Sequence, residues 1–148
     1  LVLEKDKSVI GIFCDNAVTD HDGNLFDACS YASTAAINSC KIPKYEMQDD
    51  KPVKIEGETT DPPISTLPVS VTMARIGDYI LVDPNMDEWS CLDARITITT
   101  NSDGNVVALQ KGGPEGFTHD QLIKCAEISI QVGSKIREII KEATKGSN

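Results

Sequence analysis

No run of apolar residues in the sequence approaches the length of about 18 that a transmembrane helix needs. The chain also lacks a Cys-x-x-Cys pair, has only two histidines, and carries five widely spaced cysteines. An odd number of cysteines without metal-ligand spacing argues against a disulfide framework and against a structural zinc site. We therefore expect a protein of a reducing compartment, with no membrane association, no metal site and no cofactor.

Basic residues are scarce as well: 14 lysines and arginines stand against 23 aspartates and glutamates, and the formal net charge is −9. Because affinity for nucleic acids comes largely from Lys and Arg side chains that release counterions, the chain alone should bind RNA or DNA poorly. Its 148 residues suffice for one domain, or for one domain with part of another. The sequence begins at Leu1 without an initiator Met or a signal-peptide segment, and we interpret it as part of a longer protein.

The first half of the chain predicts few regular elements. Residues 8–14 are a short apolar run, which predicts a buried strand. Residues 25–38 predict a helix, and its small side chains would let it approach a sheet closely, so we expect it to be buried. Residues 41–68 contain five prolines, which interrupt helices and ladders. This segment predicts an acidic, exposed linker with room for one short strand at residues 53–55.

The second half alternates between apolar and polar residues with the period of a strand. The alternation and its turns predict antiparallel strands at residues 69–76, 79–83, 95–100 and 105–110. The first of these strands should be half-buried. Thr118 and Gln121 have the spacing of a capping box, and an apolar stripe that includes Leu122 and Ile139 follows them. The fold class is therefore α+β: a strand and an Ala-rich helix, then a mostly antiparallel β meander packed on a long C-terminal helix.

Two carboxylates beside the third of these strands are candidate site residues. Asp87 and Asp93 stand six positions apart, and Asp93 directly precedes the strand. Such a pair can bind a metal ion or transfer a proton. For any single Asp taken alone, a solvated turn residue is the more common case. Ser90 and Cys91 lie between them without a nearby histidine to activate either as a nucleophile. Trp89 packs either on a neighbouring chain or in the core.

Taken in order, these segments resemble the second half of RNase PH-like proteins, and most closely the non-catalytic ring subunits of the exosome. The matching signatures are Asp22-Gly-Asn-Leu-Phe-Asp-Ala-Cys29, Pro68-Val-Ser-Val-Thr-Met-Ala-Arg-Ile-Gly77, Leu81-Val-Asp-Pro84, and Leu109-Gln-Lys-Gly-Gly113 before the long helix. The resemblance implies that residues 1–62 are the C-terminal part of a first RNase PH-like domain plus an acidic linker. Residues 63–148 would be the RNase PH-like C-terminal domain.

The resemblance also implies partners and a location. The chain would help to close a six-membered ring of RNase PH-like subunits that supports 3′-to-5′ RNA processing and degradation. Its partners would be the other ring subunits and the cap proteins, with RNA passing through the assembled channel. The expected location is the nucleus, nucleolus and cytoplasm in a eukaryote, and the cytoplasm in an archaeon.

In catalytic relatives, phosphate attacks the 3′ end of RNA with the help of an acidic pair that matches Asp87 and Asp93. Active relatives also have a Gly-Gly-Thr-Arg type of segment that grips the attacking phosphate. Here the same place holds Asn24, Leu25, Phe26 and Asp27: Phe26 stands at the arginine position, and Asp27 would repel an anion.

The resemblance therefore implies a lost phosphate site, a vestigial acidic pair and no catalytic residue. Two other hypotheses stay open: an active phosphate-dependent exoribonuclease, and an acidic α/β interaction domain unrelated to RNA.

Overall fold

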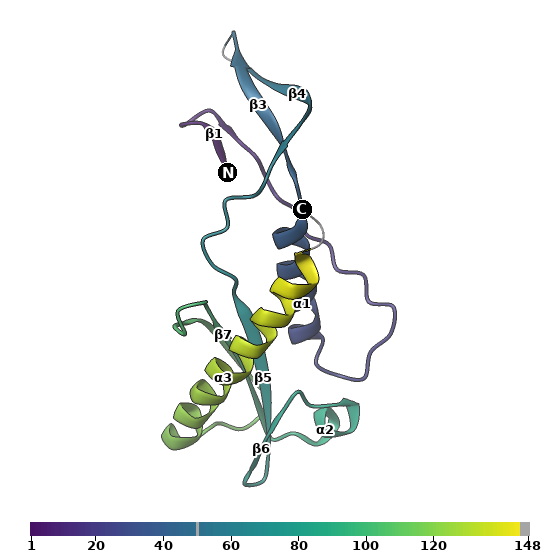
Figure 1. Ribbon diagram of the computed structural model, residues 1–148. Coiled ribbons are helices and arrows are strands. Elements are labelled where there is room, and N and C mark those ends of the chain that lie inside the picture. The colour runs from purple at the N-terminus through teal and green to yellow at the C-terminus, as the bar shows by residue number, and fades with distance from the viewer. Residues whose placement is uncertain (50, 146–148) are drawn as a thin grey trace.

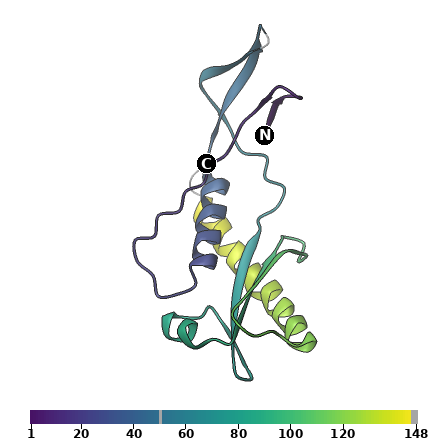
Figure 2. The same cartoon turned by 180° about the vertical axis from the view of Figure 1, so that it is seen from behind.

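The computed structural model describes residues 1–49 and 51–145 (Figure 1). A four-stranded sheet with α3 lies at one end of the molecule, and the β3–β4 hairpin projects from the other end, as the view from behind also shows (Figure 2). The elements are β1 (Val2–Glu4), β2 (Ser8–Val9), α1 (Leu25–Ser39), β3 (Ile42–Gln48), β4 (Lys51–Thr60), β5 (Val69–Ile76), β6 (Tyr79–Val82), α2 (Met86–Cys91), β7 (Ala94–Thr100), β8 (Val106–Gly112) and α3 (His119–Thr144).

The main sheet is antiparallel throughout, and its strand order is β6-β5-β7-β8. The strands and the antiparallel pairing agree with the prediction, but the order differs from that of a simple meander. The chain leaves β6 through α2, a helix that the sequence did not predict, and returns on the other side of β5. Consequently β5 has a neighbour on each edge. It is buried on both faces from Val69 to Ala74 and not half-buried as predicted.

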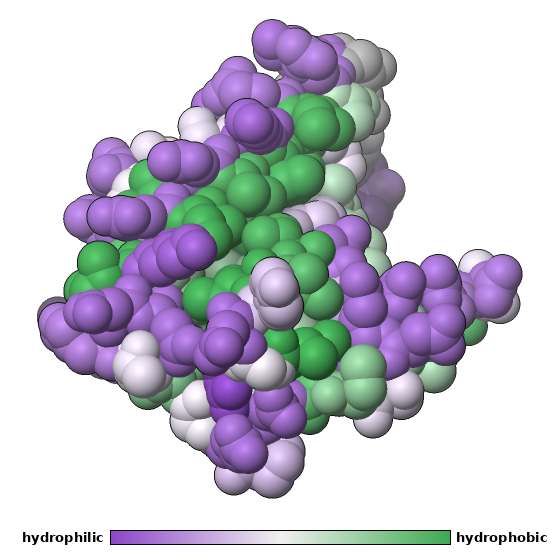
Figure 3. All heavy atoms as spheres, turned by 90° about the horizontal axis from the view of Figure 1, so that it is seen from below, coloured by the Kyte–Doolittle hydropathy of each residue, from purple (hydrophilic) through white to green (hydrophobic). Residues whose placement is uncertain are grey.

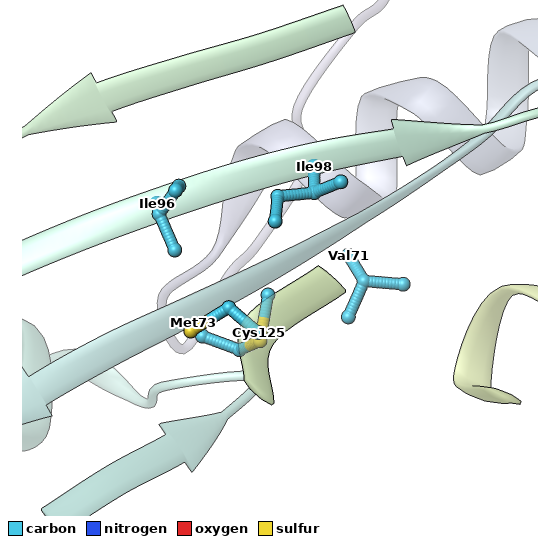
Figure 4. Close-up of a cluster of buried hydrophobic side chains, with 5 residues drawn as sticks. All are labelled: Val71, Met73, Ile96, Ile98 and Cys125. Carbon is cyan, nitrogen blue, oxygen red and sulfur yellow. The ribbon is translucent and has the colours of Figure 1, made fainter. Parts of the chain in front are cut away.

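The hydrophobic core lies between the sheet and α3 (Figure 4). It contains Val71 and Met73 from β5, Ile96 and Ile98 from β7, and Cys125 from α3. Alternation along the strands places these four aliphatic side chains on one face, as predicted for Ile96 and Ile98. Burying each such side chain contributes about 1.5–3 kcal/mol. Burial also raises the pKa of the Cys125 thiol, so this side chain stays protonated and packs as a small apolar residue.

Helix α3 begins at the predicted capping box, where the Gln121 amide N–H donates to Thr118 Oγ1 at 3.3 Å and Gln121 Oε1 accepts from the Thr118 N–H at 2.9 Å. Its buried face differs from the predicted apolar stripe, because Ile139 is 59% exposed and Leu122 is also exposed. Arg137 is buried instead. Its Nη1 donates to the carbonyl and the hydroxyl of Thr100 at 2.9 and 3.1 Å, and this burial lowers the pKa of its guanidinium.

The sequence predicted that helix α1 is buried through its small residues, and this prediction is wrong. The alanines on one side of it are exposed, namely Ala28, Ala32 and Ala36. The side that packs on the rest of the protein is polar. The Thr34 hydroxyl donates to the Pro68 carbonyl at 3.1 Å, and the Asn38 amide donates to the Thr144 hydroxyl of α3 at 2.6 Å. Hydrogen bonds to the sheet and to α3 therefore decide which face of α1 turns inward.

The first part of the chain is more exposed than predicted. Only Ser8–Val9 of the expected buried strand pairs, with β1, and Phe13 is 91% exposed. No strand within residues 1–49 and 51–145 pairs with residues 11–14, and these residues are exposed. Most of the predicted linker belongs to the β3–β4 hairpin, whose register shifts between Pro43 and Tyr45 and whose side chains are mostly exposed. Its prolines are tolerated because a strand of a two-stranded hairpin has a free edge. No helix in the described part of the chain is long and apolar enough to span a bilayer.

Replacing Gly133 of α3 by alanine should lower the free energy of unfolding by about 1–2 kcal/mol, although alanine normally favours a helix over glycine by about 1 kcal/mol. The added Cβ would lie 2.8 Å from the Thr100 hydroxyl, which the guanidinium of Arg137 already holds. Chemical denaturation measures the difference. Ser134→Ala, at the next and exposed position, is the control and should change stability by no more than about 0.5 kcal/mol. A stabilised Gly133→Ala protein would contradict the close approach of α3 to β7.

Candidate functional site

The turn before α1 meets the turn before α2. Gly23 and Asn85 form an isolated antiparallel bridge between these two turns. Gly23 has a φ of 104°, and a Cβ at this position would lie 2.5 Å from the Pro84 carbonyl oxygen. Only glycine combines this backbone conformation with such a close approach. The bridge brings residues that are 62 positions apart (23 and 85) into one site.

Asn24 and Asp27, two residues of the segment that the resemblance gives as a lost phosphate site, form a buried polar network. The Asn24 amide donates to Asp27 at 2.9 Å and to Asp83 at 2.7 Å. Asp27 also accepts from the backbone N–H of Thr72 at 2.7 Å and from the Thr72 hydroxyl at 2.8 Å. Burial raises the pKa of the Asp27 carboxyl, and these hydrogen bonds oppose the shift. Burial likewise raises the pKa of Tyr31, one turn further along α1.

The position of Asp27 adds a role that the sequence did not predict. Its side chain is only 3% exposed, and its oxygens accept from Asn24, the N-cap residue of α1, and from Thr72 on β5. Asp27 is therefore an internal anchor that joins the first turn of α1 to the sheet. That its charge would repel an anion stays a prediction.

The other two residues of the segment, Leu25 and Phe26, line an open pocket of about 280 Å³. The remaining lining residues are His21, Gly23, Asn24, Met86 and Trp89. Phe26 is 40% exposed and Met86 46% exposed. The place where the resemblance puts a phosphate-gripping arginine is thus an apolar and aromatic concavity.

A residue that sequence reasoning missed completes this site. The guanidinium of Arg95, on β7, lies 4.8 Å from the centre of the Phe26 ring and 4.7 Å from that of Trp89. Both distances are within the range of cation–π attraction. Gly112 on β8 leaves the room, because a Cβ there would lie 2.3 Å from Arg95 Nε. Within the described residues Arg95 makes no ion pair. The available signal was the alternation of β7, which places Arg95 on the face opposite Ile96.

The acidic pair does not meet at this pocket. Asp93 Oδ2 accepts from the backbone N–H of Gly77 at 2.7 Å and lies 3.6 Å from Arg75 Nη1, so it fixes the β5–β6 turn. Asp87 lies in the first turn of α2, where its exposed carboxylate has no partner among the described residues. Neither residue lines the pocket, and the described part of the chain holds no cluster of three or more His, Cys, Asp or Glu that could bind a metal.

Asp27→Ala should lower the free energy of unfolding by roughly 3 kcal/mol, because it leaves the buried backbone N–H of Thr72 without its acceptor and removes one of the two acceptors of the Asn24 amide. Asp22→Ala is the matched control, since Asp22 is exposed and has no partner among the described residues, and it should shift stability by no more than about 0.5 kcal/mol. Thermal and urea unfolding of both variants measure the difference. Equal stability of the two variants would show that Asp27 is not an anchor.

Comparison with known proteins assigns this arrangement to a family. Residues 66–132 match the model of the 3′ exoribonuclease family, domain 2. The chain is 39% identical over 144 residues to the exosome complex component Rrp42 of Thermococcus gammatolerans, an alignment that covers 97% of this chain and 53% of the relative. The chain thus spans about half the length of the curated relatives it matches.

Solved structures agree with the sequence comparison. An archaeal exosome core chain superposes with a TM-score of 0.70 and 38% identity, over 82% of this chain and 47% of that chain. A chain of the Archaeoglobus fulgidus exosome with RNA bound to the active site gives a TM-score of 0.70 and 40% identity, over 82% and 45% of the two chains. Residues 66–132 therefore belong to the 3′ exoribonuclease family as its domain 2, and the chain matches the second half of exosome Rrp42 components, which are RNase PH-like. The predicted family and the predicted α+β fold class are confirmed.

Proposed function

We propose that this chain is a structural, non-catalytic part of an exosome ring of RNase PH-like subunits, in support of 3′-to-5′ RNA processing and degradation. Identities of 38–40% to chains of two archaeal exosome structures support the assembly. Its partners would be the other ring subunits and the cap proteins, with RNA in the assembled channel. The archaeal relatives support a cytoplasmic location, and a nuclear or nucleolar location stays a prediction for a eukaryotic protein.

The observation that carries the non-catalytic assignment is the stack of Phe26, Arg95 and Trp89. It lies where active relatives are expected to hold the attacking phosphate, and it presents ring faces and an apolar pocket instead of a loop of phosphate-binding donors. A phosphorolytic site without its preorganised anion contacts loses most of its transition-state stabilisation. Asp93, which would have to serve the same phosphate, is bonded to the β5–β6 turn.

The domain assignment remains part of this proposal. A boundary after residue 62 is supported by the β3–β4 hairpin, which ends at Thr60, and by the family match, which begins at residue 66. Residues 1–62 would complete a first RNase PH-like domain, and residues 63–148 would form the C-terminal domain.

We expect no release of ADP when the purified protein is incubated with poly(A), inorganic phosphate and Mg²⁺. Phe26 cannot form the charge-assisted hydrogen bonds with which an arginine grips phosphate. Chromatography of the nucleotides measures the product, and the Asp93→Ala variant, assayed in parallel, should be equally inactive. ADP release by the unaltered protein that disappears in Asp93→Ala would establish the alternative function, an active exoribonuclease.

The isolated chain should form dimers or larger particles. Its exposed apolar residues include Phe13 at 91% and Val9 at 72%, and exposed apolar patches of this kind mark interaction sites. Phe13→Asp should shift the particles toward monomer in light scattering, whereas Tyr79→Asp, on the distant β6, should not. A well-behaved monomer at high concentration would count against a ring-subunit role.

A further inference from the structure

The pocket at the start of α1 has the composition of a protein-docking site. Phe26, Met86 and Trp89 supply its apolar surface, and two of the three are at least 40% exposed. The lower face of the molecule, where α2 and the β5–β6 turn lie, shows apolar surface framed by hydrophilic residues (Figure 3). Trp, Phe and Met are enriched where proteins bind one another, and a concave site of this kind takes one anchoring side chain.

The wall of the pocket is rigid on one side. Arg95 of β7 lies against both aromatic rings, and Gly112 of β8, which has no side chain, leaves space for its guanidinium. The bridge between Gly23 and Asn85 fixes the two turns that carry the lining residues. A preformed pocket lowers the entropic cost of binding, so a short segment suffices as a ligand.

The charges around the pocket select the partner. The two stretches that form it, residues 8–40 and 76–94, contain no lysine or arginine. Asp22 stands between two lining residues, and Asp87 directly follows the lining residue Met86. Both carboxylates are exposed and have no partner within the described residues. One cation, Arg95, lies on the pocket wall, where it faces the two aromatic rings. We call the two exposed carboxylates that neighbour the lining residues the acidic rim. An apolar pocket with such a rim is complementary to an apolar side chain between basic residues.

We propose that this pocket docks a partner protein through one apolar or aromatic side chain flanked by lysine or arginine. A nucleic acid fits the rim poorly, because its phosphates would face the carboxylates. A second copy of this chain fits poorly too, because both copies carry the same acidic rim. The proposal rests on the proposed function only in that a site without phosphorolysis is free to hold a protein segment.

The test uses a fluorescein-labelled peptide, Arg-Lys-Phe-Lys-Arg, and two matched peptides, Arg-Lys-Ser-Lys-Arg and Glu-Asp-Phe-Asp-Glu. Fluorescence anisotropy at low salt measures binding of each labelled peptide to the intact protein. Unlabelled peptide is used in a second measurement, in which binding changes the fluorescence of Trp89, the single tryptophan of the chain. We expect saturable binding of the first peptide only. Oligo(A) is titrated in parallel as the nucleic-acid probe.

Variants locate the binding site. Met86→Asp should weaken binding of the first peptide roughly tenfold or more, as expected for loss of an anchor contact. Asp87→Asn should weaken it about two- to fivefold at low salt, as expected for one exposed charge pair. Tyr79→Asp is the control, since Tyr79 is an exposed aromatic residue outside the pocket, and it should bind as the unaltered protein does. Circular dichroism of each variant checks that the fold is retained.

Four results would overturn the proposal. They are equal binding of the serine peptide, unchanged binding by a folded Met86→Asp protein, binding of oligo(A) in place of the peptide, and self-association that Met86→Asp abolishes. None of them depends on phosphorolysis. ADP release from poly(A) would refute the non-catalytic function and leave the peptide measurements to decide the docking site.

Discussion

The hydrogen bonds between the Asp27 carboxylate and Thr72 join the start of α1 to the middle of the sheet, and the position of the site depends on them. Thr72 lies on β5, which like β7 has a neighbouring strand on each edge, so this contact fixes α1 to the interior of the sheet. Asn24 extends the network to Asp83, beyond β6. Since Asp27 turns inward, the adjacent Phe26 projects on a different side of the helical turn and lines the pocket.

This contact also explains why α1 packs through polar residues. The face of the sheet opposite the hydrophobic core carries threonines, and the hydroxyls of Thr72 and Thr97 lie 2.8 Å apart. A helix that covers such a face must supply acceptors, because an unpaired buried donor costs about 1–3 kcal/mol. Asp27 supplies them, whereas the alanines on the other side of α1 could not. The two faces of one sheet therefore need different partners: Cys125 and its apolar neighbours on α3, and the polar side of α1.

The sequence pattern predicted those elements whose formation depends on neighbouring residues in the chain. Alternation predicted β5 and β7, and the capping box predicted the start of α3, because both signals act within a few residues. The strand order, the burial of Arg137 and the exposure of residues 11–14 depend on which distant segments cover them, and no periodicity contains that information. At the site, the resemblance identified Asn24 to Asp27, but the inward direction of Asp27 and the approach of Arg95 follow from contacts across 45 and 69 positions (27 to 72, and 26 to 95).

A residue at a catalytic position of this family need not perform the family's chemistry, because its contacts decide what it does. Asp93 is present, yet its oxygen accepts from the Gly77 N–H and lies near Arg75, so a structural role is sufficient reason to keep a carboxylate there. Arg95 adds a cation near the expected phosphate position, but its guanidinium lies over the rings of Phe26 and Trp89. Residues 8–40 and 76–94 add no lysine or arginine to it. A cation in that setting organises aromatic side chains more than it attracts an anion. The pocket is thus better suited to an apolar side chain with positive neighbours than to the phosphate it would hold in an active relative.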